Sequence, residues 1–310
     1  MFKLAITAGN WLTRRSLNVT SAGKIDTETE TRRPSPGCLM AIGGAEDRTN
    51  GCELLQVFAE LCGGTSARIV LITTASSMPA RAFAIYAAAF RRLGICDIRE
   101  LRLASHEQAD GEQALTVLAR ATGVFFTGGD QARLEFLAGS GTNLALRGRV
   151  AADSLVVAGT SAGAAALGPV MILGGSVCSN DHNRDNRETT DDRLRTGRGL
   201  GLLPGAIIDM HFTQRRRLPR LLAAVARHPS HLGIGIDEDT AVLARSGRLH
   251  VLGRGEVVTV DKGLLPVAGS RTGPAASLVL AVPGEPAPDT QLHRLRANDA
   301  FDLEHRHPYR

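Results

Sequence analysis

Short apolar runs recur along the first half of the sequence, each followed by glycine, threonine or other small and polar residues. The runs are Cys38 to Ile42, Ile69 to Thr73, Ile98 to Leu103, Val124 to Phe126 and Leu155 to Ala158. Short runs with many β-branched residues are typical of strands buried on both faces. The longer segments between them, 51–62, 79–92, 112–120 and 131–137, favour helices, and Pro79 suits a first helical turn. This alternation predicts an α/β three-layer sandwich with a mainly parallel central sheet.

The pattern changes after Ala241, where short apolar segments alternate with glycine-containing turns. The segments are Ala241 to Leu243, His250 to Leu252, Val257 to Val260 and Leu278 to Ala281, and Pro283 to Asp289 is interpreted as a loop. This pattern predicts a C-terminal antiparallel β extension of the sheet. Gly174 to Arg198 is too polar for a core, and we expect a long loop beside the active site, either a lid or an insertion without a role.

The domain boundaries follow from the same pattern. Residues 1–37 lack sustained periodicity, so we expect a mobile N-terminal extension. They make a poor signal peptide, because no apolar segment lies between Met1 and Arg15. Residues 38–305 form the predicted domain, and residues 306–310 are expected to be a tail.

Composition excludes several functions. Of the 310 residues, 43% are hydrophobic and 22% charged, which is typical of a globular protein. The net charge is +5, but aromatic residues are only 4% and the arginines are scattered, so nucleic-acid binding is not indicated. A mild positive field favours an acidic substrate instead. Apolar runs are too short for a transmembrane helix, and we expect no membrane partner.

The cysteines give a further constraint. They are Cys38, Cys52, Cys62, Cys96 and Cys178, an odd number without C-x-x-C pairs. This pattern favours reduced, mostly buried thiols and a cytoplasmic location. His and Cys do not cluster at the spacing of zinc ligands, so we expect no metal.

One stretch carries a candidate nucleophile. Gly159 to Gly163 reads Gly-Thr-Ser-Ala-Gly and fits the G-x-S-x-G nucleophile elbow. The preceding apolar run predicts a strand and the following alanines a helix, so Ser161 lies on a sharp strand-to-helix turn. Such a turn projects the hydroxyl from the strand end and places backbone N–H groups beneath it.

Two other strand ends supply the remaining parts of a hydrolytic triad. His211 follows the apolar run at Ile207, and Asp237 and Glu238 follow the run from Gly233 to Ile236. The order Ser, His, acid matches the nucleophile, the base and the group that orients the base. The unperturbed pKa of histidine, about 6.5, suits a general base. Adjacent strand residues face opposite ways, so the residues alone leave either Asp237 or Glu238 as the acid.

Together these segments carry a family resemblance. The matching stretches are Met40 to Arg48, Phe125 to Gln131, Gly159 to Ala164, Asp209 to Leu221 and Gly233 to Ala241. They resemble the cyanophycinases, in the serine peptidase family that also holds the α-aspartyl dipeptidases. The resemblance implies a fold similar to class I glutamine amidotransferases, a homodimer, no cofactor, and Glu238 as the orienting acid.

Further site residues surround the triad. We expect the backbone N–H groups of Ala162 and of the loop at Gly129 to form the oxyanion hole, because glycine permits a close approach. The substrate-binding residues are expected to be Gln131, Asp209, Arg215, Arg217 and Arg220. Arginine binds carboxylates in bidentate fashion, although a solvated basic helix start is the alternative. Two positions depart from the pattern of cyanophycinases: Met210 replaces a glutamine and Pro219 a glycine. These changes bear on the identity of the substrate more than on the catalytic chemistry.

The sequence therefore predicts a serine-type exopeptidase that hydrolyses aspartyl peptide bonds through an acyl-enzyme. As the resemblance implies, the expected substrate is cyanophycin, cleaved to β-Asp-Arg dipeptides. Two alternatives stay open: an isoaspartyl or α-aspartyl dipeptidase, and a non-catalytic amidotransferase-like binding module.

Overall fold

The N-terminal apolar runs form parallel strands of one sheet. The computed structural model describes residues 37–175, 194–262 and 290–309, which all belong to one compact unit. Adjacent strands follow the order β3 (Asp97–Leu101), β2 (Arg68–Ile72), β4 (Gly123–Phe126), β5 (Val156–Thr160) and β1 (Leu39–Ile42). Each neighbouring pair of these strands is parallel.

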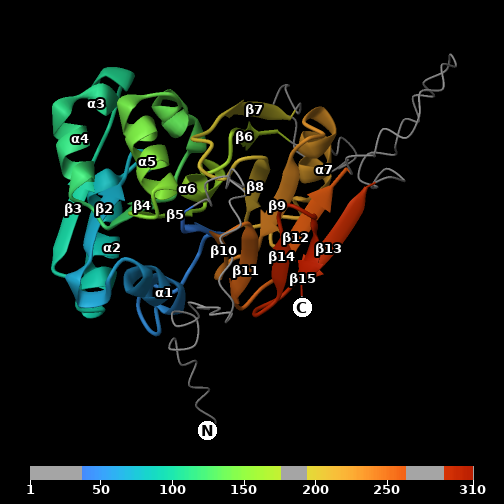
Figure 1. The fold of residues 1–310 in the computed structure, drawn as a ribbon, viewed down its shortest axis with the longest axis horizontal. Helices are drawn as coiled ribbons and strands as arrows, with labels where there is room; N and C mark the ends of the chain where they lie inside the picture. The colour runs from blue at the N-terminus through green and yellow to red at the C-terminus, as the bar shows by residue number, and fades with distance from the viewer. Residues whose placement is uncertain (1–36, 176–193, 263–289, 310) are drawn as a thin grey trace, which may run out of the picture. The chain divides into compact units, whose positions relative to one another are not determined.

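Helices cover both faces of this parallel sheet (Figure 1). One face carries α1 (Glu53–Leu61) and α2 (Pro79–Arg92), and the other carries α3 (His106–Asp110), α4 (Glu112–Ala119) and α5 (Gly141–Ala151). The alternation of strand side chains causes this division, since Ile69 and Leu71 pack with the first group of helices and Val70 and Ile72 with the second. The predicted α/β architecture with a mainly parallel central sheet is confirmed.

The C-terminal strands divide between two sheets. On the far side of β1, the first sheet continues through four antiparallel strands: β10 (Thr240–Arg245), β11 (Arg248–Gly253), β14 (Ala300–Asp302) and β15 (His307–Tyr309). The second sheet has the order β13 (Gln291–Leu295), β12 (Val257–Asp261), β9 (Leu232–Ile236), β8 (Ala206–Met210), β6 (Val170–Gly174) and β7 (Arg195–Arg198). Its strands β6, β8 and β9 are parallel, and α7 (Leu218–Arg227) packs against β8, β9 and β12.

Three expectations differ from this arrangement. The antiparallel segments extend two sheets rather than one, because β12 pairs with β9 and not with β11. The polar segment 195–198, expected to be loop, forms β7 beside β6. Residues 307–309, expected to belong to a tail, form β15 against β14. Residues 176–193 of the expected 174–198 loop, the segment Leu278 to Ala281, the loop Pro283 to Asp289 and residues 1–36 lie outside the described residues.

The topology gathers the carboxyl ends of several strands. Because β5 and β1 are parallel neighbours, Ser161 leaves its strand beside Gly43, and the Ser161 N–H donates to the Ile42 carbonyl at 3.0 Å. The end of β8 in the second sheet reaches the same turn, since the His211 N–H donates to the Gly43 carbonyl at 2.9 Å. Ligands of open α/β folds bind at such edges, so the fold places the predicted active site there.

Candidate active site

Ser161 lies on the strained turn that the sequence predicts. β5 ends at Thr160, and the four-residue helix α6 (Ala162–Ala165) begins directly after Ser161, whose φ is 51° and ψ −115°. This conformation is costly for a residue with a side chain and persists only where the surroundings impose it. A Cβ at Gly159 would collide with the Gly163 backbone, and one at Gly163 with the Phe126 carbonyl. Both glycines are therefore required for the close packing of the turn.

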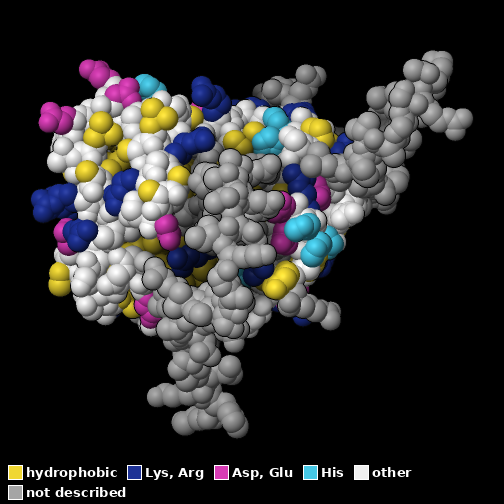
Figure 2. Space-filling model, in the orientation of Figure 1, with side chains coloured by type: hydrophobic (Ala, Val, Ile, Leu, Met, Phe, Trp, Pro, Cys, Tyr) yellow, Lys and Arg dark blue, Asp and Glu magenta, His cyan; other side chains and the backbone are white. Residues whose placement is uncertain are grey.

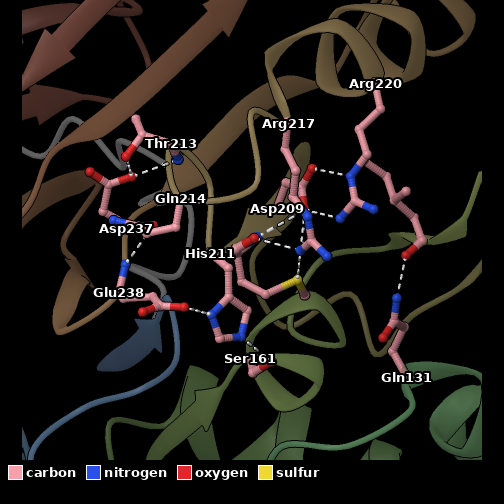
Figure 3. Close-up of polar contacts among 12 residues, drawn as sticks. Gln131, Ser161, Asp209, His211, Thr213, Gln214, Arg217, Arg220, Asp237 and Glu238 are labelled. Atoms are coloured by element: carbon pink, nitrogen blue, oxygen red, sulfur yellow. Dashed lines mark hydrogen bonds and ion pairs between the residues drawn. The ribbon is translucent and has the colours of Figure 1, made fainter. Parts of the chain in front are cut away.

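The three predicted catalytic side chains form one hydrogen-bonded chain (Figure 3). The Oγ atom of Ser161 lies 3.0 Å from Nε2 of His211, and Nδ1 of the same ring lies 2.6 Å from Oε1 of Glu238. The side chain of His211 is 12% exposed and that of Glu238 37% exposed, so the imidazole is shielded and its acid is accessible. The serine, histidine and acid come from the ends of β5, β8 and β9.

Asp237 has a different set of partners and does not touch the imidazole. Its Oδ1 accepts from the Thr213 N–H at 2.9 Å and the Thr213 hydroxyl at 2.7 Å, and its Oδ2 accepts from the Glu256 N–H at 3.0 Å. In return, the Gln214 Oε1 accepts from the Glu238 N–H at 3.2 Å. These reciprocal bonds clamp the segment after His211 to the segment that carries the acid. The sequence did not indicate Thr213 or Gln214.

The Gly43-Gly44 turn joins all three catalytic segments through the main chain. In addition to the bonds that Ser161 and His211 make to it, the Gly44 carbonyl accepts from the Asp239 N–H at 2.9 Å. Gly44 has a φ of +99°, and a Cβ there would collide with the His211 ring. The sequence did not indicate this contact between the Gly43-Gly44 turn and the imidazole.

Of the two segments predicted to supply the oxyanion donors, one follows Ser161 directly and the other runs beside it after β4. Ala162 follows Ser161 directly and is buried. A Cβ at Gly128 would lie 3.9 Å from Ser161 Oγ, so the loop after β4 runs beside the hydroxyl. Gly129 is held against the loop after β2, because a Cβ there would collide with the Ala75 carbonyl. The role of the Ala162 and Gly129 N–H groups as oxyanion donors stays a prediction.

Gln131 and its neighbour Asp130 have internal partners. The Nε2 of Gln131 donates to the Ile172 carbonyl at 2.6 Å and so ties this loop to β6. The Oδ1 of Asp130 accepts from the Ala132 N–H at 3.0 Å and caps the 3₁₀ segment η3 (Gln131–Leu137). A substrate contact of Gln131 stays a prediction.

Asp209 is fully buried beneath two arginines. Arg220 grips both of its carboxylate oxygens, through Nε to Oδ2 at 2.6 Å and through Nη2 to Oδ1. Arg217 adds an Nη1 contact to Oδ1 at 3.3 Å and a bond to the Met210 carbonyl at 2.5 Å. Instead of facing the substrate, as the sequence interpretation proposed, the carboxylate of Asp209 anchors this cluster. Burial, partly offset by Asp209, lowers the pKa of Arg217 to about 10.

The sequence positions that depart from cyanophycinases are accommodated in this cluster. The Met210 sulfur lies 3.1 Å from Nη1 of Arg217, and Pro219 occupies the first turn of α7, where proline is tolerated. The side chains of Arg217 and Arg220 are only 14% and 13% exposed, so the interpretation of a solvated basic helix start is wrong for both. Arg215 is exposed, as that interpretation proposes.

The cysteine and metal expectations can be compared only in the described residues. There, Cys38, Cys52 and Cys62 are buried thiols and Cys96 is an exposed one, while Cys178 lies outside. Burial raises the pKa of the Cys38 thiol to about 11. Within the same ranges, no cluster of His, Cys, Asp or Glu is arranged to hold a metal ion. Nor does any helix of residues 37–175, 194–262 and 290–309 have the length and apolarity to cross a membrane.

Comparison with known proteins gives one family. The profile of Peptidase family S51 matches residues 39–252. A protein named Cyanophycinase from Synechococcus elongatus is 42% identical over 73% of this chain and 68% of its own length. Another of that name, from Trichormus variabilis, is 42% identical over 76% of both chains. The crystal structure of a peptidase from an acI-B1 Actinobacterium covers 87% of this chain and 98% of its own, with a TM-score of 0.59 and 18% identity, and shares the fold. The chain therefore belongs to peptidase family S51.

Proposed function

We propose that the protein is a serine-type exopeptidase that hydrolyses cyanophycin and releases β-Asp-Arg dipeptides. The observation that carries this proposal is the hydrogen-bonded chain from Ser161 through His211 to Glu238, at three strand ends of an S51 peptidase. The substrate follows from relatives at 42% identity that are named Cyanophycinase.

The arrangement supports an acyl-transfer mechanism. Ser161 Oγ attacks the carbonyl carbon of the scissile bond while its proton passes to Nε2 of His211. Glu238 holds the opposite ring nitrogen and stabilises the imidazolium. The N–H groups of Ala162 and Gly129 bind the oxyanion. When the C–N bond breaks, His211 gives the proton to the leaving amine, and an ester to Ser161 remains.

Deacylation repeats these steps with water. His211 takes a proton from the water as its oxygen attacks the ester, and the proton returns to Ser161 Oγ when the ester breaks. The residues of the chain suffice for every proton transfer, so the proposed reaction uses no metal or organic cofactor.

The arginine cluster supports an acidic substrate. One buried carboxylate, Asp209, accompanies two guanidinium groups, Arg217 and Arg220, which leaves one net positive charge beside the strand that carries His211. Exposed Arg215 adds another. Cyanophycin carries free α-carboxylates on its arginyl groups, and arginine forks pair with such groups. We propose that Gln131 and these arginines border the substrate, with Asp209 fixing the arginines.

The oligomeric state, the location and the partners are proposed from the same family resemblance. We infer a homodimer that acts on peptides in the cytoplasm, without nucleic-acid or membrane partners. On the face shown in Figure 2, acidic and basic side chains are interspersed, which supports a peptide rather than a nucleic-acid substrate. Light scattering on the purified protein tests the dimer.

A panel of substrates tests the proposed function. Purified protein is incubated separately with cyanophycin, a β-aspartyl dipeptide and an α-aspartyl dipeptide, and products are identified by mass spectrometry. Release of β-Asp-Arg from the polymer is expected. Cleavage of a dipeptide alone would assign an aspartyl dipeptidase, and binding without any cleavage would assign a non-catalytic module.

A further inference from the structure

A buried carboxylate that the mechanism above does not use lies beside the nucleophile strand. Glu46 is 2% exposed and follows the Gly43-Gly44 turn by two residues. Its Oε2 accepts from the Thr160 hydroxyl at 2.6 Å, and its Oε1 accepts from the Tyr86 hydroxyl. A buried carboxylate is costly unless both oxygens are bonded. Here both oxygens are bonded, by hydroxyl groups from two different elements.

The Tyr86 side of this contact is fixed in the core. Tyr86 lies on α2, is 4% exposed, and its ring centroid is 5.0 Å from that of Phe125. Burial, supported by the neighbouring Glu46, raises the pKa of the phenol well above its usual range, so the hydroxyl keeps its proton and acts as a donor. Glu46 is thus anchored to rigid secondary structure.

The Thr160 side of the contact reaches the catalytic elbow. Thr160 is the last residue of β5 and directly precedes Ser161. Strain of the kind found at Ser161, with φ 51° and ψ −115°, requires constraints on both flanks. The following flank is held by Gly163 against β4, and the preceding flank by the hydroxyl bond from Thr160 to Glu46.

The same loop also contacts the base. Gly44 lies against the His211 ring, and its carbonyl binds the Asp239 N–H at 2.9 Å. When Glu46 is held in place, so is Gly44, which restricts the position of the His211 ring. The same contact holds Thr160, the residue before Ser161. Both ends of the 3.0 Å contact between Ser161 Oγ and His211 Nε2 depend on this loop.

We propose that Glu46 is a positioning residue that holds the Ser161 elbow through Thr160 and the His211 ring through Gly44. The inference rests on the proposed hydrolytic function and extends it. It assigns a task to Glu46, the buried acidic residue of the loop after β1.

The two hydroxyl donors provide a matched pair of variants. Thr160→Val and Tyr86→Phe each remove one hydroxyl from the same carboxylate and should lower the free energy of unfolding by similar amounts. Only Thr160→Val touches the elbow. We expect it to lower kcat about tenfold with KM changed less than about twofold, because the nucleophile is misplaced while binding is retained. Tyr86→Phe weakens the anchor of Glu46 but leaves the bond from Thr160 in place, so kcat should fall by less than in Thr160→Val. Thr160→Ser keeps the hydroxyl and should have a kcat near that of the wild type.

A second measurement tests the role of Glu46 independently of which peptide the protein cleaves. The rate at which a fluorophosphonate labels Ser161 reports nucleophile activation without any peptide, and it should fall further in Thr160→Val and Glu46→Gln than in Tyr86→Phe. In the Glu46→Gln background, Thr160→Val should cause little further loss. Equal losses of kcat and labelling in Thr160→Val and Tyr86→Phe, or a loss confined to KM, would overturn the inference. If the wild type is labelled but cleaves no peptide, only the proposed function fails; if it is not labelled, both fail.

Discussion

The Nδ1 atom of His211 lies 2.6 Å from Oε1 of Glu238, while the carboxylate of adjacent Asp237 is turned away and is 4% exposed. Two acids that follow one another therefore have separate tasks, because successive residues at the end of a strand point to opposite sides. Glu238 contacts the base, and Asp237 clamps Thr213 and Glu256. The two residues therefore allow a comparison between the proposed catalytic acid and a structural acid.

Glu238→Gln is expected to reduce kcat on the order of 10⁴-fold, by analogy with other triads, because the amide cannot stabilise the imidazolium. Its free energy of unfolding should change little, since this side chain is 37% exposed. Steady-state kinetics on cyanophycin, with unfolding curves for the same preparation, measure both quantities. Wild-type turnover would show that Glu238 does not orient His211.

Asp237→Asn is the matched variant. In the wild type, both carboxylate oxygens of Asp237 accept from N–H groups. The amide of asparagine must therefore turn its NH₂ group toward one of these donors. The free energy of unfolding should fall by about 1–3 kcal/mol, with a smaller loss of kcat than in Glu238→Gln. If Asp237→Asn were the slower enzyme of the two while remaining fully folded, the assignment of the acid would be reversed.

Gly44→Ala should disable the site, because the added methyl group collides with the His211 ring. A displacement of about 1 Å can cost on the order of 10²-fold in rate. Gly63→Ala is the control: Gly63 also has a positive φ, of +112°, but a Cβ there meets nothing within 4 Å. Both variants should lose stability from backbone strain, and only Gly44→Ala should lose kcat. Equal kcat values for Gly44→Ala and Gly63→Ala would show that the Gly43-Gly44 turn does not restrict the position of the His211 ring.

Arg220→Lys and Arg215→Lys separate scaffolding from substrate contact. Lysine keeps the charge but loses the planar fork that Arg220 uses on Asp209, so the free energy of unfolding should fall by about 1–3 kcal/mol. Exposed Arg215 should tolerate lysine within about 0.5 kcal/mol. A fall in kcat/KM for Arg215→Lys would then report a substrate contact directly. Unchanged stability in Arg220→Lys would contradict the anchoring role of Asp209.

The sequence predicted those features that depend on local pattern. The helix from Pro79 to Arg92 was predicted with the bounds of α2, because its first turn contains proline and its periodicity is strong. The sequence likewise predicted the elbow at Ser161 and the strand ends before His211 and Asp237, because short apolar runs end there at glycine or polar residues. The α5 helix was missed because it contains Gly141 and Gly148, which disfavour a helix. Ser140 nevertheless caps it, with its Oγ 3.2 Å from the Asn143 N–H.

Features that depend on contacts between distant segments could not be predicted. Alternating apolar residues identified β10, β11 and β12 as strands, but not that β12 pairs with β9 in a second sheet. The sequence placed Asp209 near the arginines of the next segment, yet gave no sign that Arg220 would occupy its carboxylate. The orientation of Asp237 and the contact of Gly44 with His211 also arise only when three segments meet.

The release of β-Asp-Arg from cyanophycin by the wild type and by Ser161→Ala tests directly whether the Ser161 hydroxyl is the nucleophile. The hydroxyl is the proposed nucleophile and alanine fits the elbow, so the variant should keep its melting temperature and lose about 10⁴-fold or more in kcat. Dipeptide release by the wild type alone is expected. Release at the wild-type rate by folded Ser161→Ala would contradict the assignment of Ser161 as the nucleophile.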